Sequence, residues 1–305
     1  MSEEKKIYRG EPIETKWVAE NGHCVTLDNG YDLPYCEFGE ENEEVVVTCA
    51  AYFHTFLNIV KDISKHYHVY GICMRQQEAE EEAGEEVAAT EYGDDGKILW
   101  TRQWGVDTWN AIQILGLDKK PFYYVGKCHG VLPGWWIWRN HPEALKGMVS
   151  MNLVMHAVER DKNDWDRLQR EDPNGFTLRS MRKKEGFALK AKEVAMLGVN
   201  MGRDNKGVDS RRANRLGTST ELICDSYDEV KERLSTNEIP ILYLFSTDDI
   251  LYEDFKSANE WAVFNTARSR SVYLQGEKHA SNMDIPHRLA WECLSFFDWA
   301  QLPDA

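Results

Sequence analysis

The residues with the clearest chemical potential lie in the segment 122–134, FYYVGKCHGVLPG. A β-prone run, Phe122–Val125, stops at Gly126, and Cys128 follows before an apolar stretch with helical potential. This order predicts a strand, a sharp turn and a helix, with the cysteine thiol at the apex of the turn. Glycines at positions 126 and 130 leave room for a nucleophile on a strained turn, because they carry no Cβ atom. The positive dipole end of the following helix would favour a thiolate over a thiol.

An acidic pair and a histidine stand at the ends of two later predicted strands. The strand Ile239–Phe245 leads to Asp248 and Asp249, and the strand Ser271–Leu274 leads to the loop that contains His279. A histidine oriented by a carboxylate can activate a cysteine or serine nucleophile as a general base. The chain therefore has a nucleophile, an acid and a histidine in that order, each where a predicted strand ends.

The elements that must position these residues begin with an N-terminal hairpin and a βαβ unit. Asn29-Gly30 is a typical hairpin turn between two short strands. A continuous apolar run from Val45 is typical of a strand that is buried on both faces of a parallel sheet. The predicted elements are strands over His23–Leu27, Tyr31–Phe38, Val45–Cys49 and His68–Met74, and a helix over Thr55–Tyr67.

Alternation of strands and helices continues on both sides of one long interruption. The acidic stretch Gln76–Asp95 is expected to be a solvated loop or short helix. Residues 156–235 break the alternation with a mostly helical, charge-rich segment. The remaining predicted elements are a helix over Trp104–Leu115 that ends at Gly116, a strand over Leu145–Leu153, and helices over Phe255–Ala267 and 286–300.

Three segments of the chain resemble the α/β-hydrolase superfamily. They are the elbow within LGLDKKPFYYVGKCHG, the strand and acid in IPILYLFSTDD, and the histidine turn HASNMDIP, in which an acidic residue and a proline follow the histidine. The resemblance runs from about His23 to the C-terminus. It implies an α/β fold with a mostly parallel twisted sheet flanked by helices. It also implies a hydrolase core at 21–155 and 236–305, a helical cap insertion at 156–235, and an N-terminal arm at 1–20.

The resemblance also implies a role for each chemical residue. Cys128 becomes the nucleophile, His279 the general base and Asp249 the acid, with Asp248 as the alternative acid. The backbone N–H of His129 would supply one donor to an oxyanion hole.

A second oxyanion-hole donor is expected in the turn after the first buried strand. That turn reads Cys49-Ala50-Ala51-Tyr52 where the family usually has His-Gly, and the backbone N–H of Ala51 is the expected donor. Losing such a donor typically costs about 3–4 kcal/mol in rate. A substrate pocket is expected from four apolar or aromatic residues: Tyr52, Trp135, Met151 and Met155.

Cysteine in place of serine narrows the predicted chemistry. A thiolate is a stronger nucleophile but also a better leaving group, so its attack on a poor-leaving-group ester or amide readily reverses. The chain is therefore predicted to hydrolyse an activated ester, lactone or thioester of a small, largely apolar acyl compound through a covalent thioester. An acyltransferase with the same intermediate is the first alternative. A C–C bond hydrolase or lyase, and a non-catalytic ligand-binding protein on the same fold, are further alternatives.

Each singled-out residue also has a structural interpretation. Cys128 could be a small buried hydrophobe, His279 a structural loop histidine, and Asp249 the cap of a following helix. Lys127 is expected to face solvent. Cys49 could form a redox pair with Cys128.

Composition bounds the class of protein. With 305 residues, 42% of them hydrophobic, the chain can build one sizeable core and has no apolar run of transmembrane length. A net charge of −15 argues against nucleic-acid binding. Seven cysteines without a CxxC pair, and no visible secretory signal, predict reduced thiols in the cytoplasm. Nine histidines without ligand-like spacing predict no metal, and a small-molecule substrate is expected with no cofactor and no membrane partner. Homo-oligomerisation is compatible with the sequence.

Overall fold

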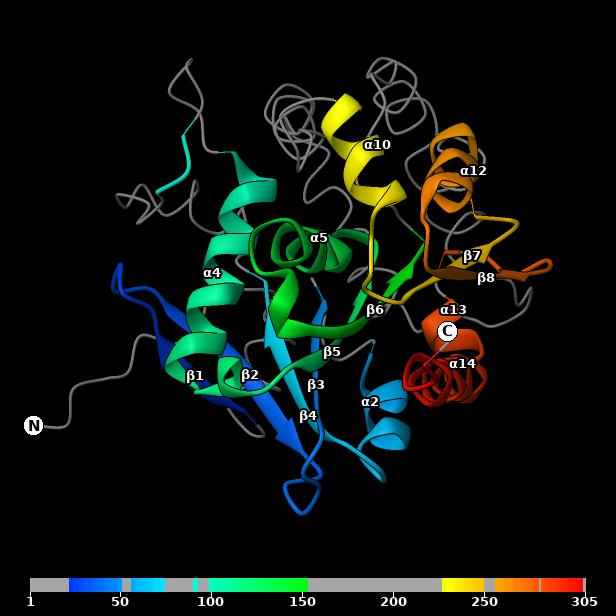
Figure 1. The fold of residues 1–305 in the computed structure, drawn as a ribbon. Coiled ribbons are helices and arrows are strands. Elements are labelled where there is room, and N and C mark those ends of the chain that lie inside the picture. The colour runs from blue at the N-terminus through cyan, green and yellow to red at the C-terminus, as the bar shows by residue number, and fades with distance from the viewer. Residues whose placement is uncertain are drawn as a thin grey trace, which may run out of the picture.

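An eight-stranded sheet with helices on both faces organises the described part of the chain (Figure 1). The computed structural model describes residues 22–50, 56–74, 90–92, 99–152, 227–249, 256–279 and 281–303. The strands are β1 (His23–Thr26), β2 (Asp32–Phe38), β3 (Val45–Ala50), β4 (His68–Cys73), β5 (Phe122–Lys127), β6 (Leu145–Met151), β7 (Ile241–Ser246) and β8 (Ser269–Leu274). The helices are α2 (Leu57–Ile63), α4 (Trp100–Ile114), α5 (Val131–Asn140), α10 (Tyr227–Ser235), α12 (Lys256–Asn265), α13 (Ser281–Asp284) and α14 (Pro286–Ala300), with 3₁₀ turns η2 (Leu117–Lys119), η3 (Cys128–Gly130) and η4 (Pro142–Ala144).

The N-terminal hairpin forms at the predicted Asn29-Gly30 turn. Gly30 has φ 83°, a conformation that glycine adopts without a Cβ clash. The Leu27 N–H donates to the Tyr31 carbonyl at 2.8 Å, which closes the turn. Strand β2 pairs antiparallel with both β1 and β4, whereas every further pair in the sheet is parallel. The spatial order is β1-β2-β4-β3-β5-β6-β7-β8, so the predicted mostly parallel sheet is confirmed.

The central strands are apolar on both sides because helices cover both faces of the sheet. Neighbouring residues of β3 illustrate this: Val46 and Val47 are both fully buried, and each belongs to a different hydrophobic cluster. The first cluster joins the sheet to α4, α5, α10 and α12, and the second joins it to α2 and α14. Figure 1 shows these two groups of helices on opposite sides of the sheet.

Parallel pairing brings the candidate residues to one edge of the sheet. The carboxyl ends of β3, β5, β6, β7 and β8 lie on the same side, since these strands run in the same direction. Cys128 follows β5, Asp249 comes shortly after β7, and His279 comes shortly after β8. Strand β3 ends beside the elbow, because Cys49 is the register partner of Gly126.

Several element boundaries differ from the sequence prediction. Strand β6 ends at Met151 instead of Leu153, because Asn152 adopts a left-handed φ of 59° and leaves the extended conformation. Helix α4 begins at Trp100, four residues before the predicted start at Trp104. It ends at Ile114, one residue before the predicted Leu115, and Gly116 has φ 71°, the left-handed conformation typical after a helix C-terminus.

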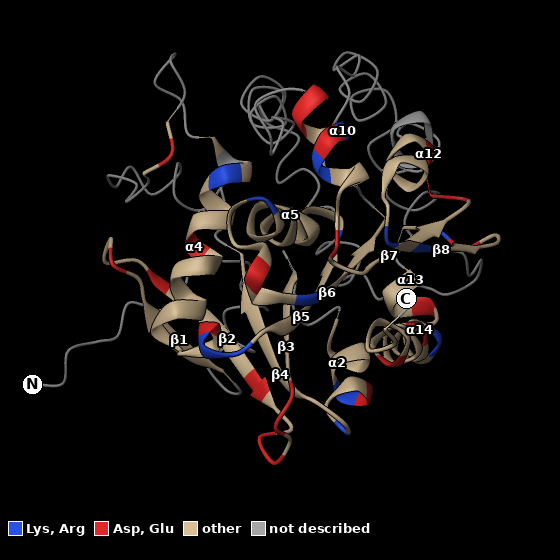
Figure 2. Ribbon diagram, in the orientation of Figure 1, with Lys and Arg blue, Asp and Glu red and all other residues tan. Residues whose placement is uncertain are grey.

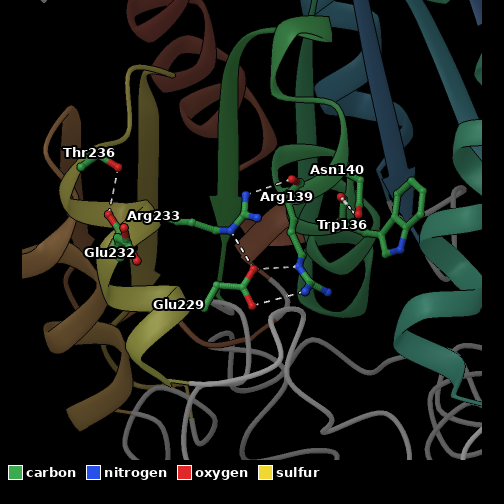
Figure 3. Close-up of polar contacts among 7 residues, drawn as sticks. All are labelled: Trp136, Arg139, Asn140, Glu229, Glu232, Arg233 and Thr236. Carbon is green, nitrogen blue, oxygen red and sulfur yellow. Dashed lines mark hydrogen bonds and ion pairs between the residues drawn. The ribbon is translucent and has the colours of Figure 1, made fainter.

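Helix α10 is attached to the end of α5 by one shared carboxylate (Figure 3). Arg139 of α5 donates through two nitrogens to both oxygens of Glu229, at 3.2 and 3.3 Å. Arg233 donates to the same carboxylate at 2.7 Å and to the Arg139 carbonyl at 3.1 Å. This network anchors α10, which occupies the end of the predicted insertion 156–235, to the helix that follows Cys128. Residues 153–226 lie outside the described ranges, so the predicted cap and its boundaries stay a prediction.

Charged residues in the described ranges lie mainly in turns and on helices, while the central strands are mostly uncharged (Figure 2). None of the helices in the described ranges combines the length and apolar character needed to cross a bilayer.

Candidate active site

Cys128 is held on a strained turn directly after β5. Its φ of 52° is left-handed, and Asn152 is the only other non-glycine residue in the described ranges with a positive φ. Such a conformation is costly for a residue with a Cβ atom and persists only where its surroundings impose it. Tyr124 helps to impose it, because its hydroxyl donates to the Gly130 carbonyl at 2.6 Å and so fixes the far side of the turn. The predicted strand, turn and helix around Cys128 are confirmed.

Gly126 is required by close backbone contact. A Cβ atom at Gly126 would overlap the Gly130 carbonyl and lie 2.6 Å from the Val131 Cα atom. Because these neighbours are backbone atoms, Gly126→Ala should displace the turn and lower the free energy of unfolding by about 1–3 kcal/mol. Urea denaturation measures that cost, and iodoacetamide labelling of Cys128 reports the displacement.

Gly116→Ala is the matched control for this variant. Gly116 has φ 71°, but a Cβ atom there would meet no other atom within 4 Å, so its replacement costs only backbone strain, about 1 kcal/mol. Labelling of Cys128 should be unchanged in Gly116→Ala and altered in Gly126→Ala. Equal labelling in both variants would contradict a steric role for Gly126.

His279 and Asp249 form a buried pair at the same sheet edge. The Nδ1 atom of His279 lies 2.8 Å from Oδ2 of Asp249, and the Asp249 side chain is fully buried. Asp248 makes different contacts: its N–H donates to the Glu277 carbonyl, and its carboxylate accepts from the Thr247 hydroxyl at 3.3 Å. Of the two candidate acids, the structure therefore brings Asp249 against the histidine. This contact leaves Nε2 of His279 as the ring nitrogen for proton transfer.

Asn152, which directly follows β6, links the end of β7 to the loop that contains His279. It is not among the site residues predicted from the sequence. Its side-chain amide donates to the His279 carbonyl at 3.2 Å and its amide oxygen accepts from the Ser246 N–H at 2.9 Å. Ser246, the last residue of β7, also donates to the Ser281 hydroxyl at 3.1 Å. These buried contacts fix the position of the loop that carries Asp249 relative to the loop that carries His279. A single asparagine after a strand gave no sequence signal of this role.

Cys128 lies beside two imidazoles. Its Sγ atom is 3.4 Å from Nδ1 of His129. Burial alone would raise the pKa of the Cys128 thiol, but the charges and hydrogen bonds of His129 and His279 outweigh burial. The pKa of Cys128 is consequently lowered well below its usual value, which favours the thiolate over the thiol.

His279 is the cationic partner in this arrangement. Burial lowers its pKa, and the neighbouring charge of Lys127 acts in the same direction. The charges of Asp249 and Cys128, together with the hydrogen bond to Asp249, act against both and raise the pKa of His279 to about 9. The lowered pKa of Cys128 and the raised pKa of His279 both favour a thiolate–imidazolium pair, a form that activates cysteine nucleophiles.

Lys127 differs from its predicted place in solvent. It is the last residue of β5, its side chain is partly buried, and its register partner is the buried Met151. Burial lowers the pKa of Lys127, while the charges of Cys128 and Asp249 raise it in part. Its ammonium is thus part of the charge balance of the site. Strand alternation could have indicated this, because Lys127 shares a sheet face with the buried Val125.

The other predicted site residues divide into described and undescribed ones. Ala51, Tyr52 and Met155 lie outside the described ranges, so the second oxyanion-hole donor and half of the predicted pocket remain predictions. Trp135 of α5 is fully buried and stacks on Tyr243, with ring centroids 6.2 Å apart. Met151 is also buried, in the cluster that contains α2 and α14. Both side chains are placed in the core.

Cys49 contacts α4 and Tyr124, the residue whose hydroxyl also donates to the elbow turn. Its Sγ atom lies 4.0 Å from the Thr108 hydroxyl on α4, and it also interacts with the Tyr124 hydroxyl. These partners account for its burial as part of the core below α4. The redox pair of Cys49 with Cys128 stays a prediction.

Comparison with solved structures gives the fold a name. A hydrolase from Pseudomonas aeruginosa PA01 matches with a TM-score of 0.65 and 18% identity, over 91% of this chain and 98% of that one. A thermophilic esterase from Thermogutta terrifontis matches with a TM-score of 0.64 and 12% identity, over 92% and 100%. An enol-lactonase from Burkholderia xenovorans LB400 matches with a TM-score of 0.65 and 15% identity, over 90% and 100%. No protein-family model and no curated protein sequence matches the chain. With the strand order and the parallel core described above, these likenesses identify the fold of this chain as the α/β-hydrolase fold.

Proposed function

We propose that this chain is a hydrolase of activated acyl compounds, namely esters, lactones or thioesters, that works through a covalent thioester on Cys128. The observation that carries the proposal is the left-handed turn that presents Cys128 at the sheet edge where His279 contacts Asp249 at 2.8 Å. The names of similar structures point the same way, since they include an esterase, an enol-lactonase and an N-acyl homoserine lactone degrading enzyme. Fold alone does not carry function, so the proposal depends on the site.

Acylation begins from the ion pair of the Cys128 thiolate and the His279 imidazolium. The sulfur forms a bond to the carbonyl carbon, and the carbonyl electron pair moves to oxygen. The backbone N–H of His129, the residue directly after the nucleophile, stabilises that oxyanion. When the tetrahedral intermediate collapses, the leaving group takes the Nε2 proton of His279. A thioester and a neutral imidazole remain.

Deacylation returns the site to its resting charge state. Neutral His279 takes a proton from water as the water oxygen bonds to the thioester carbon. Collapse of the second tetrahedral intermediate breaks the C–S bond, releases a carboxylic acid and restores the thiolate. Asp249 keeps Nδ1 of His279 occupied throughout, so that Nε2 carries the proton in both directions.

The substrate class follows from the leaving-group chemistry of sulfur. A stabilised thiolate departs more easily than an alkoxide or an amide, so attack on a simple ester or amide reverts to substrate. Thioesters, lactones and enol esters have leaving groups that compete with the thiolate. The thioester intermediate also reacts with amines, alcohols and thiols, which keeps acyl transfer as the second candidate activity.

A substrate panel with added acceptors tests the proposal. Purified protein is incubated with acyl thioesters, lactones and enol esters of graded chain length, and the released acid is quantified with and without an added amine, alcohol or thiol. Hydrolysis predicts acid as the main product at all acceptor concentrations. Product that partitions to the acceptor would identify a transferase. No turnover of any member would contradict the proposal.

The pH dependence of kcat/KM should differ from the pH dependence of Cys128 alkylation by iodoacetamide. Because the pKa of His279 is about 9, its proton is available to the leaving group below that pH and is lost above it. We therefore expect kcat/KM for a thioester to be flat near neutral pH and to fall above about pH 9. Alkylation of Cys128 by iodoacetamide needs only the thiolate and should not fall there. A kcat/KM that rises through pH 8–9 would indicate an ordinary thiol instead of a resting ion pair.

A further inference from the structure

The candidate nucleophile has a second imidazole neighbour in addition to His279. The Nδ1 atom of His129 lies 3.4 Å from Sγ of Cys128, within hydrogen-bond range for sulfur. His279, in the loop after β8, lowers the pKa of the same thiol, while its own Nδ1 atom is occupied by Asp249. The two rings therefore act on the thiol from different elements. In the mechanism above, the side chain of His129 has no role, since only its backbone N–H is used.

The fold holds the His129 ring in this position. Trp104 of α4 contacts it edge-to-face, with ring centroids 5.7 Å apart and an interplanar angle of 75°. Trp104 itself is buried in the core below α4 and α5. On the other side of the turn, the Gly130 carbonyl accepts from the Tyr124 hydroxyl at 2.6 Å. The contact with Trp104 and the hydrogen-bonded turn together keep the His129 ring near the Cys128 sulfur.

We propose that His129 is a second imidazole partner of Cys128, which holds the sulfur as a thiolate independently of His279. The proposal rests on the proposed function in one respect: it assigns His129 a part in catalysis only if Cys128 is the nucleophile. The proton balance is simple. With His279 present, the thiol proton resides on His279 and His129 adds a hydrogen bond. With His279 removed, His129 accepts the thiol proton on Nδ1 and becomes the imidazolium of the pair.

The titratable groups around the Cys128–His279 pair come from four elements. His129 lies on the turn η3, Lys127 at the end of β5, His279 in the loop after β8, and Asp249, behind His279, in the loop after β7. Lys127 also carries positive charge toward the thiolate. The contribution of His129 is therefore measured as a difference between variants that keep Lys127 and Asp249 in place.

A second hydrogen bond to the sulfur has a consequence for the reaction. It weakens when the sulfur becomes a neutral thioester and re-forms as the thiolate leaves in deacylation. His129 thus favours C–S cleavage over retention of the acyl group. It also makes the thiolate a better leaving group during acylation, which further restricts the site to substrates with good leaving groups.

The test is the pH dependence of alkylation at Cys128, followed by peptide mass after limited iodoacetamide treatment of the full chain. Four proteins are compared: wild type, His129→Phe, His279→Ala and the double variant. Phenylalanine keeps a ring for Trp104 but has no nitrogen for the sulfur. Cys24, which is partly exposed, serves as an internal reference thiol in every sample.

We expect His129→Phe to raise the alkylation midpoint of Cys128 by about one pH unit, equivalent to about tenfold slower alkylation at pH values below both midpoints. The double variant should have a higher midpoint than His279→Ala, because neither imidazole then stabilises the thiolate. His129→Asn, which can place an amide donor near the former Nδ1 position, should recover part of the shift. Equal midpoints in wild type and His129→Phe, and in His279→Ala and the double variant, would overturn the proposal.

Turnover assays on the same proteins keep this inference separate from the proposed function. Shifted alkylation midpoints with no turnover of any acyl substrate would leave the thiolate partnership standing and overturn the hydrolase. Unshifted midpoints with normal turnover would overturn the role of His129 and leave the proposed hydrolase standing. If His129→Phe fails to fold by circular dichroism, His279→Ala is compared with a double variant that carries His129→Asn and His279→Ala. Asparagine cannot accept the thiol proton, so the midpoint should be higher in that double variant, and equal midpoints would overturn the proposal.

Discussion

Cys128→Ala should abolish turnover of every acyl substrate, with a loss in kcat/KM on the order of 10⁴-fold or more. The reason is that alanine cannot form the covalent intermediate, while the rest of the site is unchanged. Alanine has the same difficulty as cysteine at the left-handed φ of 52°, so the free energy of unfolding should change little. Initial rates on the thioester and lactone panel, with urea denaturation of the same sample, measure both quantities.

Cys24→Ala is the matched control for the loss of a thiol. Cys24 is also partly exposed but lies on β1, at the far edge of the sheet from β7 and β8. Its replacement should leave kcat/KM unchanged within a factor of about two, as expected for a substitution away from the site. Retained activity in Cys128→Ala would contradict covalent catalysis by this cysteine, whatever the behaviour of the control.

Asp249→Asn should lower kcat/KM by about 10³–10⁴-fold with little change in the position of the side chain. The amide removes the charge that raises the pKa of His279, and it can donate to Nδ1, which leaves the wrong ring nitrogen protonated. The upper limit of the pH profile should move below about 9, because burial and Lys127 then lower the pKa of His279 with less opposition. A kcat/KM profile from about pH 6 to 10, spanning the usual and raised pKa values of histidine, measures both effects.

Asp248→Asn is the matched control for Asp249→Asn, because it removes the same charge from a carboxylate that does not contact His279. Asp248 is the neighbouring residue with the same charge, but its carboxylate accepts from Thr247 instead of contacting His279. We expect only a few-fold change in kcat/KM and an unmoved upper pH limit. If Asp248→Asn proved the more damaging of the two, the assignment of Asp249 as the acid would be wrong.

The fold was largely predictable because most strands have a local sequence signal. Continuous apolar runs such as Val45–Cys49 require cover on both faces, and Asn29-Gly30 requires a tight turn. Strand ends were less predictable. The end of β6 depends on the left-handed φ of Asn152, which is imposed by contacts with β7 and the His279 loop. Such contacts join residues far apart in sequence, so no local pattern carries them.

The sequence predicted the three residues of the candidate site, but it did not predict which charged and imidazole side chains surround them. Cys128, His279 and Asp249 could be selected because each follows a strand, and the structure brings them to one sheet edge. The partial burial of Lys127 and the contact of the His129 ring with sulfur were not foreseen. Both depend on how a strained turn directs neighbouring side chains, a property that residue types alone do not specify.

The most direct test of covalent catalysis at Cys128 is the intact mass of the protein after brief incubation with an acyl thioester and rapid acid quenching. Covalent catalysis predicts an increase equal to the acyl group, located on the peptide that contains Cys128, absent from Cys128→Ala, and longer-lived in Asp249→Asn. Turnover of the thioester without any such adduct, or an adduct of the same size on Cys128→Ala, would contradict it.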